Sequence, residues 1–413
     1  MRDFLKVDLG RLSAGRPPAM LLGGINLARA LGIARIPVIV ASAERFTPAM
    51  ASRYCVGRCT LPPAAPREAV VERLLRAGEV LTGALCTRLP LIYGDDDQLA
   101  LVHEFRDALS PYYAFVLSEP ALSRAMNSKP LFQALAESRS LPVPRRLAWG
   151  DLEHFGRPVL AKPRSKTGWE TSAVHSQFLK GAGKARVFAD GRALLGEPLA
   201  QSLREELTLQ EYIPGDDRAL WSFHGFADEG GQLIAWFIGR KIRTYPPLTG
   251  DSSCLELAHD ADLASLGRSL VPRTGLKGVF KMDFKRHAGT GEFFLLEINA
   301  RFNLWHYLGA QGGVNLAQVA YDYMTRGERS SPAQTRARYQ WLSPRLDYLA
   351  FRALAAQREL TAGRWLASLV TTRKVYDLFA WDDPMPALAV LWDELRHFSR
   401  LRHRVMRWLS TAS

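Results

Sequence analysis

The sequence predicts a protein of α/β and α+β class with a Rossmann-like N-terminal domain, a second domain built around an antiparallel hairpin, and a helical C-terminal extension. Three observations predict this arrangement. Strands alternate with helices over the first 120 residues, two amphipathic strands follow each other near residue 290, and an apolar stripe at helical spacing follows Pro386. A chain of 413 residues is too long for one hydrophobic core, so we expect two or three domains.

The N-terminal segment alternates short apolar runs with helical patterns. Strands are expected at residues 18–22, 36–40, 89–93 and 114–117, and helices at residues 25–31, 67–77 and 98–109. This alternation predicts a parallel sheet. Gly23 and Gly24 lack the spacing of a dinucleotide-binding turn. We expect the acidic residues 95–97 to cap the following helix rather than to hold a metal.

The hairpin at residues 278–285 and 294–301 carries the main functional signal. Its side chains alternate, so each strand has one apolar and one polar face. The polar faces bring together Asp283, Glu297 and Asn299, which offer the oxygen ligands that Mg²⁺ takes together with substrate phosphates. Arg301 lies one pleat further on, where it can reach a phosphoryl or carboxylate oxygen. The alternative is the charged outer face of a surface hairpin.

An Asp on one strand and Glu-x-Asn-x-Arg on the next resemble the Mg²⁺-ATP site of the ATP-grasp superfamily, particularly its carboxylate–amine ligases. Residues 126–145, 159–163 and 209–217 resemble further parts of that pattern in the same order, so that the similarity covers roughly residues 15–330. The resemblance implies a pre-ATP-grasp domain at 1–120, an ATP-grasp domain at 121–330 with a lid subdomain at about 145–212, and a basic helical extension at 331–413.

The resemblance also implies how the nucleotide is held. Two lysines would contact the α- and β-phosphates, a hinge strand would bond adenine, and an aspartate would bond the ribose hydroxyls. The residues implied are Lys129, Lys162, Gln210, Glu211, Ile213 and Asp217, with Glu211 ranked below Gln210 because it lies on the opposite side of the strand. The alternative is that the lysines are solvated surface charges and that residues 209–217 form an ordinary buried strand ending in a turn.

Further basic residues are candidates for contact with the reacting groups. Alternation places Lys241 and Arg243 on one face, and the family resemblance implies that Arg243 contacts the terminal phosphate or the acceptor; a charged edge strand is the alternative. Lys285 shares the polar face of Asp283 and is assigned with Arg301 and Arg243 as catalytic. His306 is either a base for an amine or a structural histidine, and the second is favoured.

The phosphate lid departs from the family pattern. The family places a Gly- and Ser-rich loop after the second lysine, whereas residues 164–170 contain a single glycine. We therefore expect Arg164 and Lys166 to bind phosphate through their side chains, because backbone amides approach phosphate closely only where side chains leave room.

The function implied is ATP-dependent ligation of a carboxylate to an amine through an acyl phosphate, with release of ADP and phosphate. ATP and Mg²⁺ are the implied cofactors, with Mn²⁺ as a substitute, and amino acids are among the implied substrates. The alternatives are an ATP-grasp kinase or carboxylase-like enzyme with another acceptor, and a non-catalytic nucleotide-binding module that associates with membranes. Many family members are dimers, so a homodimer is also implied.

Composition agrees with an enzyme that acts on anions. The net charge is +13, which would attract anionic substrates. The sequence has no Lys/Arg block interleaved with aromatic residues, so we expect no nucleic-acid partner. No apolar run spans a bilayer and the first residues lack a signal-peptide pattern, so we expect a cytoplasmic protein with reduced cysteines.

The C-terminal segment presents a second question. Residues 331–413 hold thirteen Lys and Arg against seven Asp and Glu, a net charge of +6. Apolar residues recur at helical spacing from Leu388 to Trp408, and arginines occupy much of the remainder. Packing of this stripe on the protein's own core is favoured, and peripheral contact with an anionic membrane is the alternative.

Overall fold

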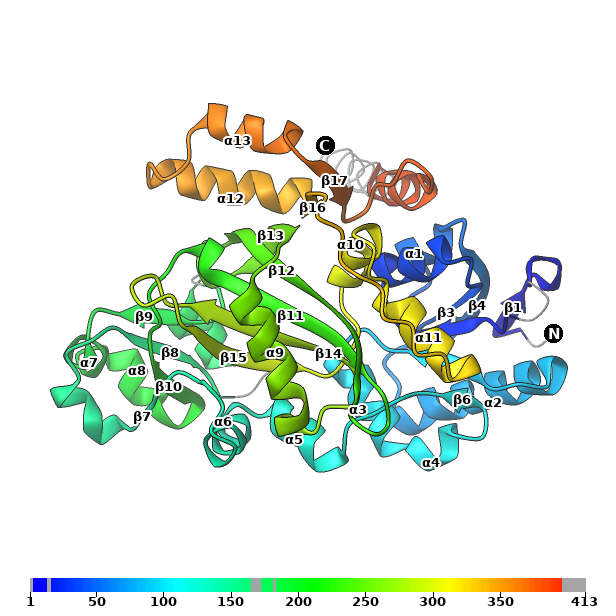
Figure 1. Cartoon of the computed structure of the whole chain (residues 1–413), viewed down its shortest axis with the longest axis horizontal. Coiled ribbons are helices and arrows are strands. Elements are labelled where there is room, and N and C mark those ends of the chain that lie inside the picture. The colour runs from blue at the N-terminus through cyan, green and yellow to red at the C-terminus, as the bar shows by residue number, and fades with distance from the viewer. Residues whose placement is uncertain (1–2, 13–15, 165–171, 181–182, 396–413) are drawn as a thin grey trace, which may run out of the picture.

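The computed structural model describes residues 3–12, 16–164, 172–180 and 183–395. In Figure 1 the N-terminal domain lies at the right, the large central sheet in the middle and a smaller sheet at the left. The expected loop at 164–170 and the stripe beyond Leu395 fall almost entirely outside the described residues.

The N-terminal domain is a six-stranded sheet in the order β1-β4-β3-β2-β5-β6, and all its pairs are parallel except β1 with β4. Its elements are β1 (Leu5–Val7), β2 (Ala19–Leu21), α1 (Ile25–Ile33), β3 (Val38–Ser42), β4 (Cys55–Thr60), α2 (Arg67–Leu85), β5 (Leu89–Ile92), α3 (Asp96–Glu104), α4 (Arg106–Leu109) and β6 (Tyr113–Ala114). The expected parallel sheet is confirmed, and the sequence analysis missed β1 and β4. Asp95 caps α3 as expected, because its side chain accepts a 2.7 Å hydrogen bond from the Gln98 amide.

The smaller sheet is antiparallel, with strand order β7-β10-β8-β9, and it has a hydrophobic core of its own. Its elements, with the two helices that precede it, are α5 (Pro120–Asn127), α6 (Lys129–Ser138), β7 (Arg146–Leu147), β8 (Val159–Pro163), β9 (Arg186–Phe188), α7 (Gly191–Leu195), α8 (Pro198–Ser202) and β10 (Leu207–Glu211). We call this sheet the lid sheet, because its strands fall within residues 145–212, where a lid subdomain is expected.

The central sheet has seven strands in the order β15-β14-β11-β12-β13-β16-β17. Its elements before residue 330 are β11 (Leu220–Ala227), β12 (Leu233–Tyr245), β13 (Asp251–Leu257), α9 (Ala261–Thr274), β14 (Gly278–Arg286), β15 (Phe293–Asn299), α10 (Trp305–Gln311) and α11 (Leu316–Arg326). The predicted antiparallel hairpin is β14–β15, in which Asp283 lies opposite Glu297 and Lys281 opposite Asn299. The alternate residues Phe280, Met282 and Phe284 are fully buried, so the expected two-faced pattern is confirmed.

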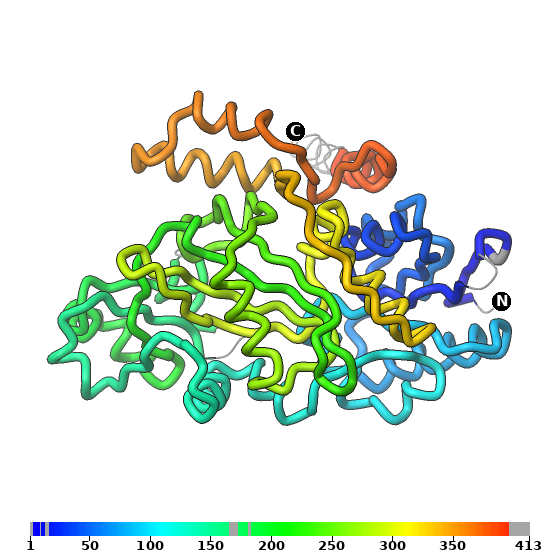
Figure 2. Tube along the Cα trace, in the orientation of Figure 1, coloured from blue at the N-terminus to red at the C-terminus, as the bar shows by residue number. Residues whose placement is uncertain are grey.

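Besides the helix that runs from residue 385 to the end of the described residues, the C-terminal extension contains two helices and two strands, and the strands complete the central sheet. Its elements are β16 (Tyr339–Leu342), α12 (Pro344–Ala356), α13 (Ala362–Val370) and β17 (Arg373–Tyr376). Figure 2 shows the chain after α11 running back along the molecule to reach α12 and α13 at its upper edge. The extension also reaches the N-terminal domain, where Asp383 forms a fully buried ion pair with Arg29 of α1 at 3.1 Å. The extension is therefore packed into the fold.

Candidate active site

A single cavity of 1110 Å³ is lined by the N-terminal domain, the lid sheet, the central sheet and the C-terminal extension. Ten of the twelve predicted site residues line it: Lys129, Lys162, Gln210, Glu211, Ile213, Asp283, Lys285, Glu297, Asn299 and Arg301. Arg243 and Asp217 do not. Residues from four separate parts of the chain thus meet at one cavity, as an enzyme site that holds two or three reactants requires.

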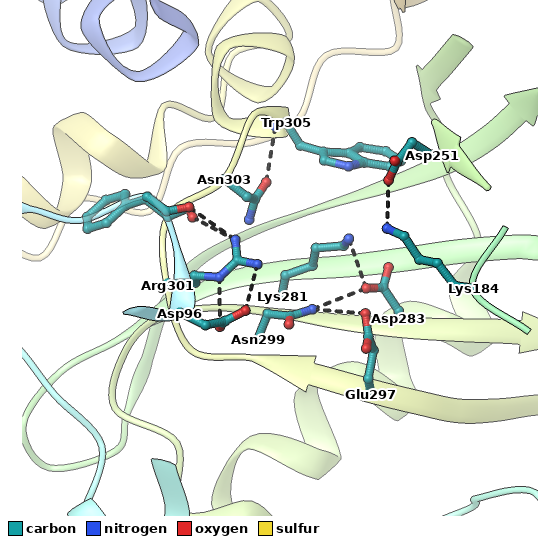
Figure 3. Close-up of polar contacts among 12 residues, drawn as sticks. Asp96, Lys184, Asp251, Lys281, Asp283, Glu297, Asn299, Arg301, Asn303 and Trp305 are labelled. Atoms are coloured by element: carbon teal, nitrogen blue, oxygen red, sulfur yellow. Dashed lines mark hydrogen bonds and ion pairs between the residues drawn. The ribbon is translucent and has the colours of Figure 1, made fainter. Parts of the chain in front are cut away.

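The three predicted metal ligands lie side by side on β14 and β15 (Figure 3). The Asn299 amide nitrogen lies 3.4 Å from Asp283 Oδ2 and 3.2 Å from Glu297 Oε1. Among the described residues, no group of three or more His, Cys, Asp and Glu side chains could hold a metal. The predicted site has two carboxylates, and its third ligand would be the side-chain oxygen of Asn299, whose amide nitrogen faces the carboxylates in this structure. Two carboxylates and one amide oxygen suit Mg²⁺, which binds few protein ligands when substrate phosphates complete its coordination.

Two lysines that the sequence analysis did not choose surround these carboxylates. Lys281 Nζ lies 2.8 Å from Asp283 Oδ2, and Lys241 on β12 also lines the cavity. Burial lowers the pKa of Lys241, and the charge of Lys281 lowers it further, while Asp283 acts in the opposite direction. Burial raises the pKa of Asp283, which Lys281 opposes. The site therefore holds buried charges of both signs that compensate one another.

Arg301 is held from the N-terminal domain. Its Nε lies 2.8 Å from Asp96 Oδ1 and its Nη2 lies 3.1 Å from Asp96 Oδ2, and Nη1 donates to the Gly94 carbonyl at 3.2 Å. Both side chains are about four-fifths buried. The sequence analysis expected the acidic run at 95–97 only to cap a helix, so the role of Asp96 was missed.

The residues expected to bind nucleotide line the cavity with partners of their own. Lys129 Nζ donates to the Pro163 carbonyl at 2.6 Å, and Gln210 Nε2 donates to Gln133 Oε1 at 2.9 Å. Glu211 pairs with Arg157 at 3.1 Å. These contacts place the groups but also occupy part of their hydrogen-bonding capacity.

Lys285 lies at the end of the cavity where β14 meets the hinge after β10. Its Nζ lies 4.1 Å from the centre of the Tyr212 ring, within the range of a cation–π contact. Burial lowers the pKa of Lys285 to about 8, and the carboxylates of Asp217 and Asp216 oppose that shift. The position and charge of Lys285 suit it to bind an anionic group in the cavity.

Arg243 lies away from the cavity, and the expectation that it shares a face with Lys241 was wrong. The β12–β13 register shifts between these two residues, so the bulge turns Lys241 toward the cavity and Arg243 toward α12. Arg243 forms a bidentate ion pair with Asp347, at 2.7 Å from Nε to Oδ1 and 3.0 Å from Nη2 to Oδ2. Both side chains are buried, so the pair joins β12 to the C-terminal extension.

The Asp217 carboxylate accepts hydrogen bonds from the end of β12 and from the loop that follows it. It accepts hydrogen bonds from the Thr244 amide at 2.7 Å, the Thr244 hydroxyl at 2.8 Å and the Leu248 amide at 2.8 Å. Its side chain is buried, and the structure does not bring it to the cavity where a ribose would lie.

His306 is buried beside the site and does not line the cavity. Its Nδ1 lies 2.8 Å from the Asn303 carbonyl oxygen and 3.0 Å from the Asn303 amide nitrogen, while Nε2 has no hydrogen-bond partner among the described residues. Burial lowers the pKa of His306 to about 4. A neutral structural histidine, the favoured alternative, agrees with this position.

The sequence was compared with protein families and with curated proteins. No family model matches the chain. It is 23% identical over 260 residues to D-aspartate ligase of Enterococcus faecium, a match that covers 60% of this chain and 61% of that relative. The chain thus spans about three-fifths of the length of the curated relative.

Solved structures of low sequence identity share the fold. The biotin carboxylase domain of Hydrogenobacter thermophilus 2-oxoglutarate carboxylase has a TM-score of 0.56 at 13% identity, covering 78% of this chain and 73% of that one. N5-carboxyaminoimidazole synthetase of Staphylococcus aureus has a TM-score of 0.53 at 12% identity, covering 78% and 81%. The L-amino acid ligase of Bacillus licheniformis has a TM-score of 0.53 at 13% identity, covering 78% and 76%. The chain has the ATP-grasp fold.

The ATP-grasp fold explains why the cavity lies where it does. The cavity lies between the lid sheet, with Lys162 on β8, and the central sheet, with Asp283 on β14. Lys184 of the lid also pairs with Asp251 of β13 at 2.6 Å, and both line the cavity (Figure 3). That contact was not predicted, because 67 residues separate the two partners in the sequence.

Proposed function

We propose that this protein is an ATP-dependent ligase that joins a carboxylate to an amine and releases ADP and phosphate. The observation that carries the proposal is the β14–β15 hairpin, which presents Asp283, Glu297 and Asn299 to a cavity also lined by Lys129 and Lys162. Two carboxylates and an amide would hold Mg²⁺ against ATP phosphates, and lysines would bind the same phosphates as point charges.

Different residues along the cavity would contact different parts of ATP and Mg²⁺. Lys129 and Lys162 bind the α- and β-phosphates, and the hinge from Gln210 to Ile213 bonds the adenine. Asp283, Glu297 and Asn299 would hold Mg²⁺, which when bound offsets charge on the phosphate oxygens; Mn²⁺ offers the same coordination and could replace it. Lys281 and Arg301 lie beside these ligands, near enough to stabilise negative charge on the transferring group.

The reaction follows from these positions. A carboxylate oxygen attacks the γ-phosphorus of ATP, the bond between that phosphorus and the bridging oxygen breaks, and ADP leaves with its electrons. The acyl phosphate then reacts with the unprotonated amine: a C–N bond forms, the C–O bond to phosphate breaks and inorganic phosphate departs. The amine proton passes to solvent or to a basic group. No nucleophilic side chain is required, so the positioning and charge of the cavity suffice.

The comparisons support amino acids as substrates. The curated relative is named for D-aspartate and one structural neighbour for L-amino acids, although both matches are distant. The biotin carboxylase domain named above was solved with magnesium ADP, ADP and bicarbonate, and an N5-carboxyaminoimidazole ribonucleotide synthetase was solved with ADP, which supports ATP and Mg²⁺ as the ligands here. The carboxylase-like alternative shares the fold, and no contact in the described cavity favours it.

The test is product analysis. The purified protein is incubated with ATP, Mg²⁺ and a mixture of L- and D-amino acids and other small carboxylic acids, and the products are identified by mass spectrometry. We expect a new amide that depends on ATP, and no product from the Glu297→Gln variant. ATP consumption without any amide in the presence of all acceptors would favour a kinase instead.

We further propose peripheral contact with an anionic membrane through the helix that begins near residue 385. No described helix is long and apolar enough to cross a membrane. However, Leu388, Leu391 and Leu395 of the stripe and the neighbouring Trp392 are each more than half exposed, so these side chains offer apolar surface to a membrane. Truncation after Pro384 keeps the buried Asp383–Arg29 pair. We expect the full chain, but not this truncation, to co-sediment with phosphatidylserine vesicles at low salt; equal behaviour of the two would contradict the proposal.

The homodimer implied by the family remains a prediction.

A further inference from the structure

The C-terminal extension contributes directly to the wall of the cavity. β16 pairs with β13 and places Trp341 opposite Leu255, which in turn lies opposite Lys241 on β12. Directly paired residues of antiparallel strands point to the same face of a sheet. Lys241 and Trp341 both line the cavity, so the face that carries the charged site continues into the extension.

Trp341 is fixed by the N-terminal domain. Its indole Nε1 donates to Asn26 Oδ1 at 3.3 Å, and Asn26 is the second residue of α1, directly after the Gly23-Gly24 turn. The side chain is 4% exposed and belongs to a core cluster that includes residues of α1 and α10. A buried indole with its N–H satisfied holds one orientation, so its ring edge forms a fixed wall.

A second indole faces the same space. Trp305, the first residue of α10, lies with its ring 5.7 Å from Lys281 Nζ and is drawn above the carboxylates in Figure 3. A Cβ on Gly239 of β12 would lie 2.2 Å from Trp305 Cζ3, so only glycine at residue 239 lets this ring lie on the sheet. Leu346, in the first turn of α12, completes an apolar lining with Trp305 and Trp341.

This apolar lining lies where the N-terminal domain meets the central sheet, because Trp341 donates to Asn26 of α1, while Lys184 of the lid reaches the central sheet at Asp251 of β13. Arg301 and Asp96 mark the same side, where the N-terminal domain meets β15, whereas Lys162 and Gln210 belong to the lid sheet. ATP contacts the lid and the hinge in the proposed function, so the wall formed by the extension faces the other reactant.

We propose that Trp341, Trp305 and Leu346 form an apolar subsite that receives the side chain of one amino-acid-like substrate and selects an aromatic or branched aliphatic group over a small or charged one. This inference rests on the proposed function for the identity of the site. The extension would then be a specificity element, and Trp341 a specificity-determining residue. A charged side chain against the two indole rings would lose its hydration, and the Lys281 ammonium beside Trp305 already pairs with Asp283 at 2.8 Å.

The direct test is equilibrium binding, which needs no turnover. The wild-type protein, saturated with Mg²⁺ and a non-hydrolysable ATP analogue, is titrated calorimetrically with phenylalanine, leucine, alanine, aspartate and lysine, each as L- and D-forms. We expect phenylalanine or leucine of one configuration to bind at least about 10-fold more tightly than alanine, aspartate or lysine. Trp341→Ala should remove that preference, and Trp341→Phe should retain part of it.

The matched control is Trp381→Ala, because Trp381 is 88% exposed and does not line the cavity. It should leave all affinities unchanged, and binding of the ATP analogue should change less than about 2-fold in every variant. Equal affinity for all five amino acids, or tighter binding of aspartate or lysine, would overturn the proposal. So would a Trp341→Ala variant that keeps the wild-type preference.

The same measurements separate this inference from the proposed function. A preference for apolar amino acids that depends on Trp341, in a protein that forms no amide, would support the subsite and contradict ligation. Amide formation without that preference would support ligation and contradict the subsite.

Discussion

Arg301 and Asp96 form a bidentate ion pair that joins the strand of the metal ligands to the N-terminal domain. Arg301 comes two residues after Asn299 at the end of β15, and Asp96 is the first residue of α3 (Figure 3). Parallel N–H···O bonds of 2.8 and 3.1 Å fix the plane of the guanidinium. The pair therefore fixes the direction of the Arg301 side chain, on which its proposed contact with a substrate oxygen depends.

Asp96→Asn should lower kcat/KM by about 10- to 100-fold, because loss of the bidentate pair frees the guanidinium and small misplacements of a positioning group are costly. The matched control is Asp97→Asn, since the Asp97 side chain is 80% exposed and its contact with Arg67 is 3.9 Å long. The measurement is kcat/KM of the two variants and of the wild type, from steady-state kinetics. Equal activity of Asp96→Asn and wild type would show that Arg301 does not depend on this partner.

Glu297→Gln and Asp283→Asn should each reduce turnover by more than about 100-fold while the protein remains folded. Burial raises the pKa of Asp283, but Lys281 pairs with it at 2.8 Å, so Asp283→Asn should cost some free energy of unfolding without unfolding the protein. Phosphate release and thermal unfolding are measured on the same samples. A variant that retains most of its activity would mean that the hairpin is only a charged surface.

Arg243→Ala should destabilise the protein by about 3–5 kcal/mol, because it leaves Asp347 buried without its cation. Asp347 also accepts hydrogen bonds from Trp365 at 2.8 Å and Ser253 at 3.1 Å, which cannot replace that charge. The double variant Arg243→Met with Asp347→Leu should be less destabilised than Arg243→Ala in urea unfolding. If Arg243→Ala is as stable as wild type but inactive, Arg243 contacts substrate after all.

The buried imidazole of His306 should make stability depend on pH. Its pKa falls from 6.5 to about 4 on folding, so the unfolded state binds the proton more tightly. Stability is therefore fully present above pH 6.5 and is lost as the pH falls from about 6.5 toward 4, by about 2 kcal/mol between pH 7 and pH 5 for this one group. His224, whose pKa burial also lowers, acts in the same direction.

The comparison of wild type with His306→Phe isolates that contribution. Urea unfolding at pH 7 and pH 5 should show a smaller loss of stability at pH 5 in the variant, even if its stability at pH 7 is lower. An identical pH dependence of the two proteins would show that His306 titrates normally in the folded state.

The sequence predicted those parts of the site that depend on local geometry. Asp283, Glu297 and Asn299 could be placed on one face because strand alternation alone sets their directions, and the structure confirms that they lie together. The parallel N-terminal sheet likewise follows from the order of strands and helices.

The remainder depends on contacts that sequence spacing does not encode. A register shift in β12 turns Lys241 and Arg243, which were expected on one face, in different directions, and no glycine or proline marks that bulge. Asp96 lies 205 residues from Arg301, and Asp347 lies 104 residues from Arg243. Acceptors such as Asp217 could not be recognised as occupied because their donors come from a loop that folds back on them.

The central claim is that the carboxylate is activated by phosphorylation. Once product analysis has identified the substrates, the carboxylate is labelled with ¹⁸O in both oxygens and the products of complete turnover are analysed by mass spectrometry. The account predicts ADP as the nucleotide and one ¹⁸O atom in each inorganic phosphate, because the attacking carboxylate oxygen stays with the γ-phosphorus when the amine displaces it. AMP as the nucleotide, carrying the ¹⁸O label, would contradict it and show an adenylate intermediate.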